Sequence, residues 1–183
     1  MKTASIGVLA LALALPMLAL SGSAHAVDGT IHIEGSVIAP TCVLTNGPSP
    51  VDIRVRLPAV AVSALSAAGE TAGRTPFIIR VADCDASTTQ VQTFFEPGPT
   101  INTSSNNLTL DGATGAAGNV ELQLLNADYS QVLLGNPLGL QNSQQVAVDT
   151  GGAALRYYAQ YVATGAATAG SANSSVTFTM IYQ

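Results

Sequence analysis

The stretch VTFTMIYQ, residues 176–183, alternates strictly between large and smaller side chains. Successive side chains of a β-strand point to opposite faces, so this alternation predicts a strand with one strongly apolar face. The apolar row comprises Val176, Phe178, Met180 and Tyr182. Neither a charge nor a proline interrupts the stretch, and natural proteins use both to protect an exposed strand edge. We therefore expect this strand to pair readily with another chain if it lies at the edge of a sheet.

A second alternating stretch, TIHIEGSV, lies near the other end of the chain at residues 30–37. Its apolar row is Ile31, Ile33 and Val37, with Gly35 in the same row. No hairpin turn or neighbouring strand in the sequence gives this segment an obvious partner. Two interpretations stay open at this point: the two end strands pair within their own sheet, or they pair with another chain.

The first 26 residues have the pattern of a secretory signal peptide. Lys2 provides the positive start, residues 6–20 form an apolar run, and Ala24-His25-Ala26 matches the small-x-small cleavage pattern. We expect cleavage after Ala26, which makes the protein an exported one. No later stretch is apolar enough to span a bilayer, so we predict no membrane insertion.

The charge of the chain excludes some classes of partner. The sequence holds 11 acidic residues against 6 basic ones, and its only lysine lies in the expected signal peptide. Nucleic acids and anionic membranes attract proteins that are rich in lysine and arginine. We therefore predict no nucleic-acid partner.

The two cysteines, Cys42 and Cys84, predict a disulfide, because an even cysteine count in an exported chain is typical of one. Closing a loop of that length stabilises a fold by about 4 kcal/mol in the chain-entropy model. A metal site needs more ligands than one distant histidine, His32, and scattered acids provide. The sequence thus predicts neither a metal nor a cofactor.

Short alternating or apolar runs recur between turn-forming residues, which is typical of an all-β sandwich. We find no linker that would divide it into two domains. Residues 59–68 favour a short helical turn. The expected strands cover residues 30–38, 51–57, 76–82, 91–95, 108–110, 120–125, 133–134, 144–148, 154–162 and 176–182.

The motifs of common enzymes are missing from the sequence. His32 lies within an expected strand, and no G-x-S-x-G nucleophile turn accompanies it. Asp83 and Asp85 flank Cys84, but a solvated loop at a strand end explains them more simply than paired catalytic acids. No phosphate-binding glycine loop is present. We predict that the protein is not an enzyme.

Four pieces of the chain, in order, resemble the pilin subunits of chaperone–usher fimbriae, particularly the type 1 fimbrial protein family. The pieces are GTIHIEGSVIAPTC (29–42), LSAAGETAGRTPFIIRVADC (65–84), NVELQLLNADYSQVLLG (119–135) and LRYYAQYVATGAATAGSANSSVTFTMIYQ (155–183). The last piece contains Gly170 and the penultimate aromatic Tyr182, which are similar to the family's C-terminal signature. The resemblance covers essentially the whole chain after the expected signal peptide.

The resemblance implies an incomplete immunoglobulin-like sandwich that lacks its last strand and is completed by a donor strand from another subunit. Residues 27–38 would form the donor extension and residues 39–183 the pilin domain. The donor side chains would be Ile31, Ile33 and Val37, together with Gly35. The implied partners are neighbouring subunits, a periplasmic chaperone and an outer-membrane usher, in a cell-surface fimbria of a Gram-negative bacterium.

The resemblance also assigns the other end of the chain. The strand at the edge of the groove, which the chaperone would contact, would present Gly170, Val176, Phe178, Met180, Tyr182 and Gln183. Arg54, Arg56 and Pro58 stand where the family usually has an apolar strand, which leaves open whether the subunit belongs to the shaft or to a minor position. The alternative function is a secreted β-sandwich module that binds carbohydrate or a receptor.

Overall fold

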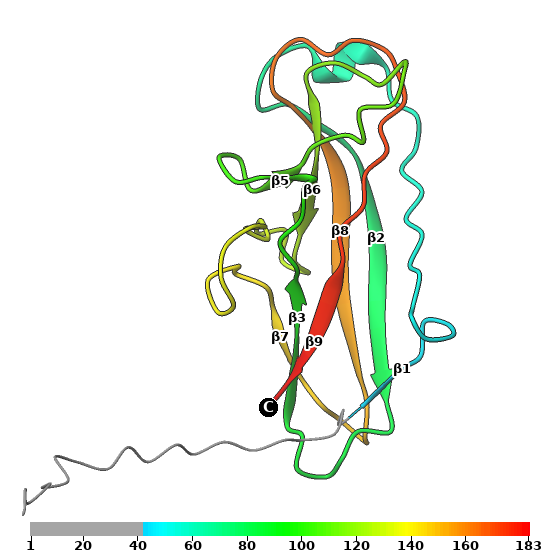
Figure 1. Ribbon diagram of the computed structural model, residues 1–183, viewed down its shortest axis with the longest axis vertical. Helices are drawn as coiled ribbons and strands as arrows, with labels where there is room; N and C mark the ends of the chain where they lie inside the picture. The colour runs from blue at the N-terminus through cyan, green and yellow to red at the C-terminus, as the bar shows by residue number, and fades with distance from the viewer. Residues whose placement is uncertain (1–41) are drawn as a thin grey trace, which may run out of the picture. The chain divides into compact units, whose positions relative to one another are not determined.

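The computed structural model describes residues 42–183, and these residues form two packed β-sheets (Figure 1). The expected signal peptide and the donor residues Ile31, Ile33, Gly35 and Val37 lie outside the described residues. None of the helices within 42–183 is long and apolar enough to cross a membrane. The elements are β1 (Val43–Leu44), the 3₁₀ helix η1 (Val62–Leu65), β2 (Thr71–Ala82), β3 (Gln90–Phe95), β4 (Ile101–Asn102), β5 (Asn107–Leu108), β6 (Val120–Leu125), β7 (Gln145–Ala147), β8 (Ala153–Ala163) and β9 (Phe178–Tyr182).

The larger sheet has the strand order β1-β2-β8-β6-β5-β4, and each neighbouring pair is antiparallel. Its centre is the long pair β2 and β8, in which Phe77 lies opposite Tyr157 and Ile79 lies opposite Leu155. A bulge interrupts this pair between Ala72 and Thr75. It places Gly73 at a positive φ directly beneath the ring of Tyr161, where a side chain would collide.

The smaller sheet has the order β7-β3-β9, so the C-terminal strand β9 is one of its edges. Antiparallel pairing sets Val91 opposite Tyr182, Thr93 opposite Met180 and Phe95 opposite Phe178. In Figure 1 the β3–β9 pair lies in front of the β2–β8 pair, and the core fills the space between the two sheets.

The core consists of the side chains that point inward from both sheets. Tyr157 is fully buried, and its ring stacks on Phe77 and meets Phe95 edge-on, with centroid distances of 5.7 and 5.5 Å. The Tyr157 hydroxyl lies 3.0 Å from the hydroxyl of Ser143, which satisfies the polar end of this aromatic side chain. The other fully buried large side chains are Phe95, Ile79, Leu134, Leu155, Val91 and Val132.

One carboxylate lies inside this largely apolar molecule. Glu121 on β6 is only 6% exposed and accepts hydrogen bonds from the Asn102 amide, the Ser105 hydroxyl and the Asn107 amide at 2.7, 2.7 and 3.0 Å. Burial acts to raise the pKa of Glu121, but the three donors together lower it below the ordinary value. Glu121 therefore fastens the short β4–β5 hairpin to the side of β6.

The sequence prediction of an all-β sandwich is confirmed, and most expected strands have their counterparts. Two expected strands are wrong: residues 51–57 and 133–134 form no strand. The helical turn expected within residues 59–68 is the 3₁₀ helix η1. β2 begins earlier than expected, at Thr71, because the bulge with Gly73 continues the strand past the point where the simple alternation ends.

Candidate functional site

The strand β9 has a hydrogen-bonded neighbour on one side only. The main-chain groups of Gln183 pair with those of Gln90, and the Glu96 N–H donates to the oxygen of Thr177, so every second residue faces β3. In an antiparallel ladder the intervening residues direct their N–H and C=O groups to the opposite edge. These residues are Phe178, Met180 and Tyr182, and nothing within residues 42–183 pairs with that edge.

The same three residues direct their side chains into the core. Met180 is a buried member of the core cluster, whereas Phe178 and Tyr182 are only half-buried and pack against it. Val176 is also half-buried and packs on this cluster, but it precedes the hydrogen-bonded strand, which begins at Phe178. The edge of β9 therefore combines unpaired main-chain groups with apolar side chains that the fold leaves partly uncovered.

A second unpaired segment packs on the same core. In residues 51–57, Ile53, Val55 and Leu57 are half-buried against the core cluster, whereas Arg54 and Arg56 point into solvent. This inside–outside alternation is that of a strand, but no main-chain hydrogen bond within the described part of the chain holds the segment in a sheet. The expected strand is thus extended and lacks its ladder. The strand predicted here is wrong because the segment has the alternation of a strand but no hydrogen-bonded neighbour among the described residues.

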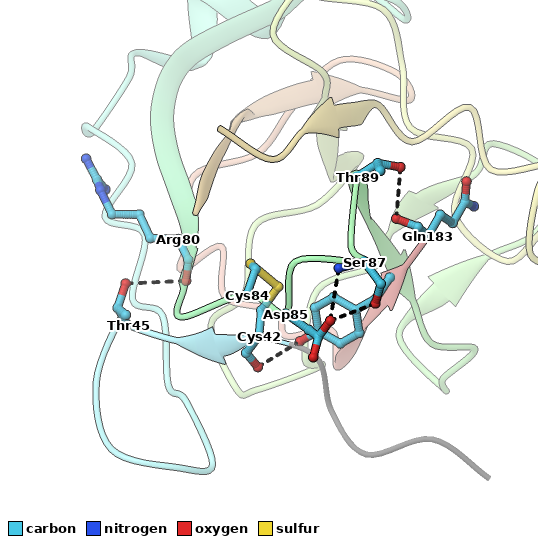
Figure 2. Close-up of a disulfide and its surroundings, with 9 residues drawn as sticks. Cys42, Thr45, Arg80, Cys84, Asp85, Ser87, Thr89 and Gln183 are labelled. Carbon is cyan, nitrogen blue, oxygen red and sulfur yellow. Dashed lines mark hydrogen bonds between the residues drawn. A yellow bond between two sulfur atoms is a disulfide. The ribbon is translucent and has the colours of Figure 1, made fainter. Parts of the chain in front are cut away.

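The disulfide between Cys42 and Cys84 fastens the start of the described chain beside the end of β9 (Figure 2). The Tyr182 hydroxyl donates to the main-chain oxygen of Cys42 at 3.4 Å, and burial raises the pKa of this phenol. The predicted disulfide is therefore present. It fixes Cys42, the first described residue, to the body of the fold.

The last residue, Gln183, is held by the turn that precedes β3. Its main-chain oxygen accepts hydrogen bonds from the N–H groups of Thr89 and Gln90 at 2.6 and 2.9 Å, and from the Thr89 hydroxyl at 3.2 Å (Figure 2). Its side chain is exposed. The contact between Gln183 and a chaperone, which the family resemblance implies, stays a prediction.

Gly170 lies before β9, at a crossing of two chain segments and not on the edge strand. The N–H of Ser171 donates to the oxygen of Gly115, and the N–H of Ala117 donates to the oxygen of Ser171, at 2.9 and 2.8 Å. A Cβ on Gly170 would overlap main-chain atoms of Gly115, Ala116 and Ala117. The crossing thus requires glycine, and it fixes where the final segment leaves the end of the sandwich.

We expect Gly170→Ala to lower the free energy of unfolding by about 2–3 kcal/mol, because the two backbones must separate to admit a methyl group. Gly165→Ala in the same loop is the matched control, since its Cβ would meet only the Asn119 side chain at an ordinary 3.5 Å. Urea unfolding of the purified full chain measures both. Equal stability of the two variants would contradict the importance of the crossing.

A known protein family matches most of this chain. The model of the type-1 fimbrial protein A family matches residues 57–183, the part that contains the edge strand and the Gly170 crossing. The chain belongs to the type-1 fimbrial protein family. Over 165 residues it is 45% identical to the major fimbrial subunit SMF-1 of Stenotrophomonas maltophilia. The aligned region covers 87% of this chain and 95% of that protein. It is 37% identical to the F17 fimbrial protein of Escherichia coli, with 90% and 93% covered.

Solved structures of fimbrial proteins share the fold. The P pilus rod subunit PapA superposes with a TM-score of 0.59 at 19% identity, covering 79% of this chain and 100% of that one. A subunit of a chaperone–usher pilus superposes with a TM-score of 0.61 at 20% identity, covering 85% and 95%. The fold of this fimbrial protein is therefore the incomplete immunoglobulin-like sandwich of pilins.

This member of the type-1 fimbrial family is a structural subunit of a chaperone–usher fimbria, and such subunits polymerise with one another into surface fimbriae of Gram-negative bacteria. The family is a structural one and not a family of enzymes. Residues 42–183 bring no group of three His, Cys, Asp or Glu side chains together in a way that would hold a metal ion.

Proposed function

We propose that this subunit polymerises by donor-strand exchange, with residues 27–38 as the donor and the free edge of β9 as the acceptor. Two features at this edge carry the proposal. Within residues 42–183 the outward main-chain groups of Phe178, Met180 and Tyr182 have no partner, and the side chains of Phe178 and Tyr182 are only half-buried. One added strand from a neighbour supplies both: hydrogen bonds for the edge and apolar side chains for the core.

The donor segment has the side chains for this task. Ile31, Ile33 and Val37 recur on one face of an extended chain, and burying each contributes roughly 1.5–3 kcal/mol. Gly35 in the same row suits a place where the two backbones approach closely. Subunits joined in this way stay together without a covalent link.

The segment 51–57 provides the opposite wall for the inserted strand. Ile53, Val55 and Leu57 already pack on the shared core, and the main chain of this segment has no ladder partner in the described structure. A donor strand between residues 51–57 and β9 would cover the core cluster from both sides. The donor strand would also give the extended segment 51–57 a neighbouring strand.

Before assembly the same uncovered core needs protection, because an apolar strand edge aggregates. In this proposal a periplasmic chaperone covers the edge of β9 with a strand of its own, and an outer-membrane usher exchanges that strand for the extension of the next subunit. Residues 1–26 direct the chain out of the cytoplasm and are then removed. The finished subunit reaches the cell-surface fimbria.

A charge placed in the donor row tests the proposal. We expect Ile33→Asp to reduce assembled fibres to less than about a tenth, because a carboxylate would have to enter an apolar groove without a partner. His32→Asp, in the opposite row of the same segment, is the matched control and should retain most of the fibres. Electron microscopy of the cells and the ladder of polymers in unheated gel samples measure both. Equal behaviour of the two variants would rule out the donor role of this row.

A further inference from the structure

The outer face of the larger sheet collects positive charge. Arg74 and Arg80 on β2 and Arg156 on β8 are all exposed, and the residues that alternate with them face the core. β2 and β8 lie side by side (Figure 1), with Arg156 opposite Ile78. None of the three has a carboxylate within 4.0 Å, since the one ion pair among residues 42–183 joins Arg54 to Asp52. In a chain with an excess of acids, three unpaired arginines on one face need an explanation.

Arg74 is held in a fixed orientation by a chain of amides. Its Nε donates to the Gln160 side-chain oxygen at 2.9 Å, and the Gln160 amide donates to the Gln123 oxygen at 2.8 Å. Gln160 is only 4% exposed, although its strand position faces outward. Arg74 is exposed, and its terminal N–H groups have no hydrogen-bond partner among residues 42–183. Such a preoriented fork suits two-point binding of a carboxylate or sulfate.

Two tyrosines lie directly beside this guanidinium. The Arg74 guanidinium carbon lies 4.5 Å from the centre of the Tyr129 ring, and the rings of Tyr129 and Tyr158 are 4.9 Å apart. Tyr158 raises the pKa of Tyr129, and the positive charges of Arg74 and Arg156 act in the opposite direction with smaller effect. Tyr129 is 52% exposed, so its ring is available to a ligand. We call Arg74, Tyr129, Arg156 and Tyr158 the arginine–tyrosine face.

The backbone at Tyr129 adds an independent observation. Tyr129 lies in a tight turn after β6 in which Asn126 and Ser130 are hydrogen-bonded, and its φ is 68°. Turns of this kind favour glycine or asparagine at the left-handed position, because a Cβ is disfavoured there. A large exposed aromatic in this conformation lowers stability and gains only surface contacts. Backbone strain of this kind accumulates at binding sites.

We propose that the arginine–tyrosine face binds an anionic saccharide chain, one that carries uronate carboxylates or sulfate esters. The guanidinium of one arginine binds a carboxylate or a sulfate through two parallel hydrogen bonds. A tyrosine ring offers an apolar surface with a polar tip, on which a sugar ring can pack. Arg80 extends the charge along β2, about 20 Å from Arg74 at the usual rise per strand residue. An extended polymer can span the distance from Arg74 to Arg80, whereas a single sugar cannot.

This inference goes beyond the assembly of the fibre. The strength of saccharide binding at a cell surface, however, rests on the proposed function. A fibre repeats the face once per subunit, and linked sites on one polymer bind far more tightly than one site alone. A weak site on each subunit is therefore sufficient. The repeated sites would let the shaft itself adhere to an acidic glycan coat.

A chondroitin sulfate dodecasaccharide, labelled at one end, tests the proposal by fluorescence anisotropy against fibres sheared from cells and against the purified full chain. We expect the double substitution Arg74→Gln/Arg156→Gln to weaken binding about tenfold, the loss of two charge-assisted contacts. Arg54→Gln/Arg56→Gln removes the same charge elsewhere and should change binding by no more than about twofold. A neutral dextran of equal length should not bind.

Tyr129→Gly separates binding from stability. Because glycine suits the left-handed turn, we expect the free energy of unfolding to stay the same or rise, while binding weakens about fivefold. Full binding by this variant, or equal losses for the two arginine pairs, would overturn the proposal. A third result would also overturn it: wild-type fibres bind no saccharide, and fibres of the Arg74→Gln/Arg156→Gln variant fall apart. The face would then be a contact between copies of the subunit.

Electron microscopy separates this inference from the proposed function. Fibres that form but bind no chondroitin sulfate contradict the saccharide site and leave donor-strand assembly standing. Binding by the purified full chain, together with cells that produce the wild-type subunit but no fibres, supports the saccharide site and contradicts the assembly proposal.

Discussion

Substituting alanine for both Phe178 and Tyr182 should remove the subunit from the fibre and sharply reduce its amount in the cell. Both side chains are half-buried in the core cluster, so each truncation should cost roughly 2–4 kcal/mol, toward the low end of the range for buried aromatics. Tyr182 also loses its hydrogen bond to Cys42. Because domains are stable by only about 5–15 kcal/mol, the double variant should be largely unfolded.

The matched control for this experiment is Thr177→Ala, on the opposite and exposed face of the same segment. Its hydrogen bond to Glu96 uses the main-chain oxygen, which the substitution leaves in place. Subunit in cell extracts and in sheared fibres is measured by immunoblot for both variants. A double variant that accumulates as a stable, soluble monomer would show that the sandwich does not depend on its edge strand.

Glu121→Leu should be the second strongly destabilising change. The leucine would leave the Asn102, Ser105 and Asn107 donors without their acceptor, and each unsatisfied buried donor costs about 1–3 kcal/mol. We expect a loss of several kcal/mol, measured by urea unfolding at neutral pH. Glu121→Gln keeps one of the two acceptor oxygens in a side chain of the same shape and should lose less.

The same residue predicts a pH dependence. The pKa of Glu121 is lowered below 4.5 in the fold, so the ionised form is the one that the folded chain stabilises. Its contribution is therefore present above pH 4.5 and is lost as the pH falls through the lowered pKa. The wild type should lose stability over this acidic range by more than Glu121→Gln does. Parallel acid unfolding curves would mean that Glu121 is not the group responsible.

The local pattern of the sequence was sufficient for most of the strands and for one covalent link. Alternation predicted β9 and the central part of β2, and the cysteine pair predicted the disulfide, because side-chain period and residue type are local properties. Alternation failed for residues 51–57 for a definite reason. It shows which side chains face a core, but a strand also needs a neighbouring backbone, and nothing local reveals that none is present.

The candidate site divides in the same way. The apolar row of β9 was visible as a pattern, and so was the row Ile31, Ile33 and Val37, whose donor role stays a prediction because it lies outside the described residues. The reason for Gly170 was not visible, because the colliding atoms of residues 115–117 lie far away in the sequence. Its place in a C-terminal signature therefore suggested an edge contact, whereas it lies at a backbone crossing.

By itself, the sequence determined an all-β chain with an apolar C-terminal strand and a disulfide, since alternation and composition depend only on neighbours along the chain. Only the tertiary structure decided that the edge of β9 has no partner within residues 42–183, that Glu121 holds a hairpin, and that Arg74 meets Tyr129. These features join residues that are distant in sequence. Their energies come from burial and hydrogen-bond geometry, which exist only once the two sheets have packed.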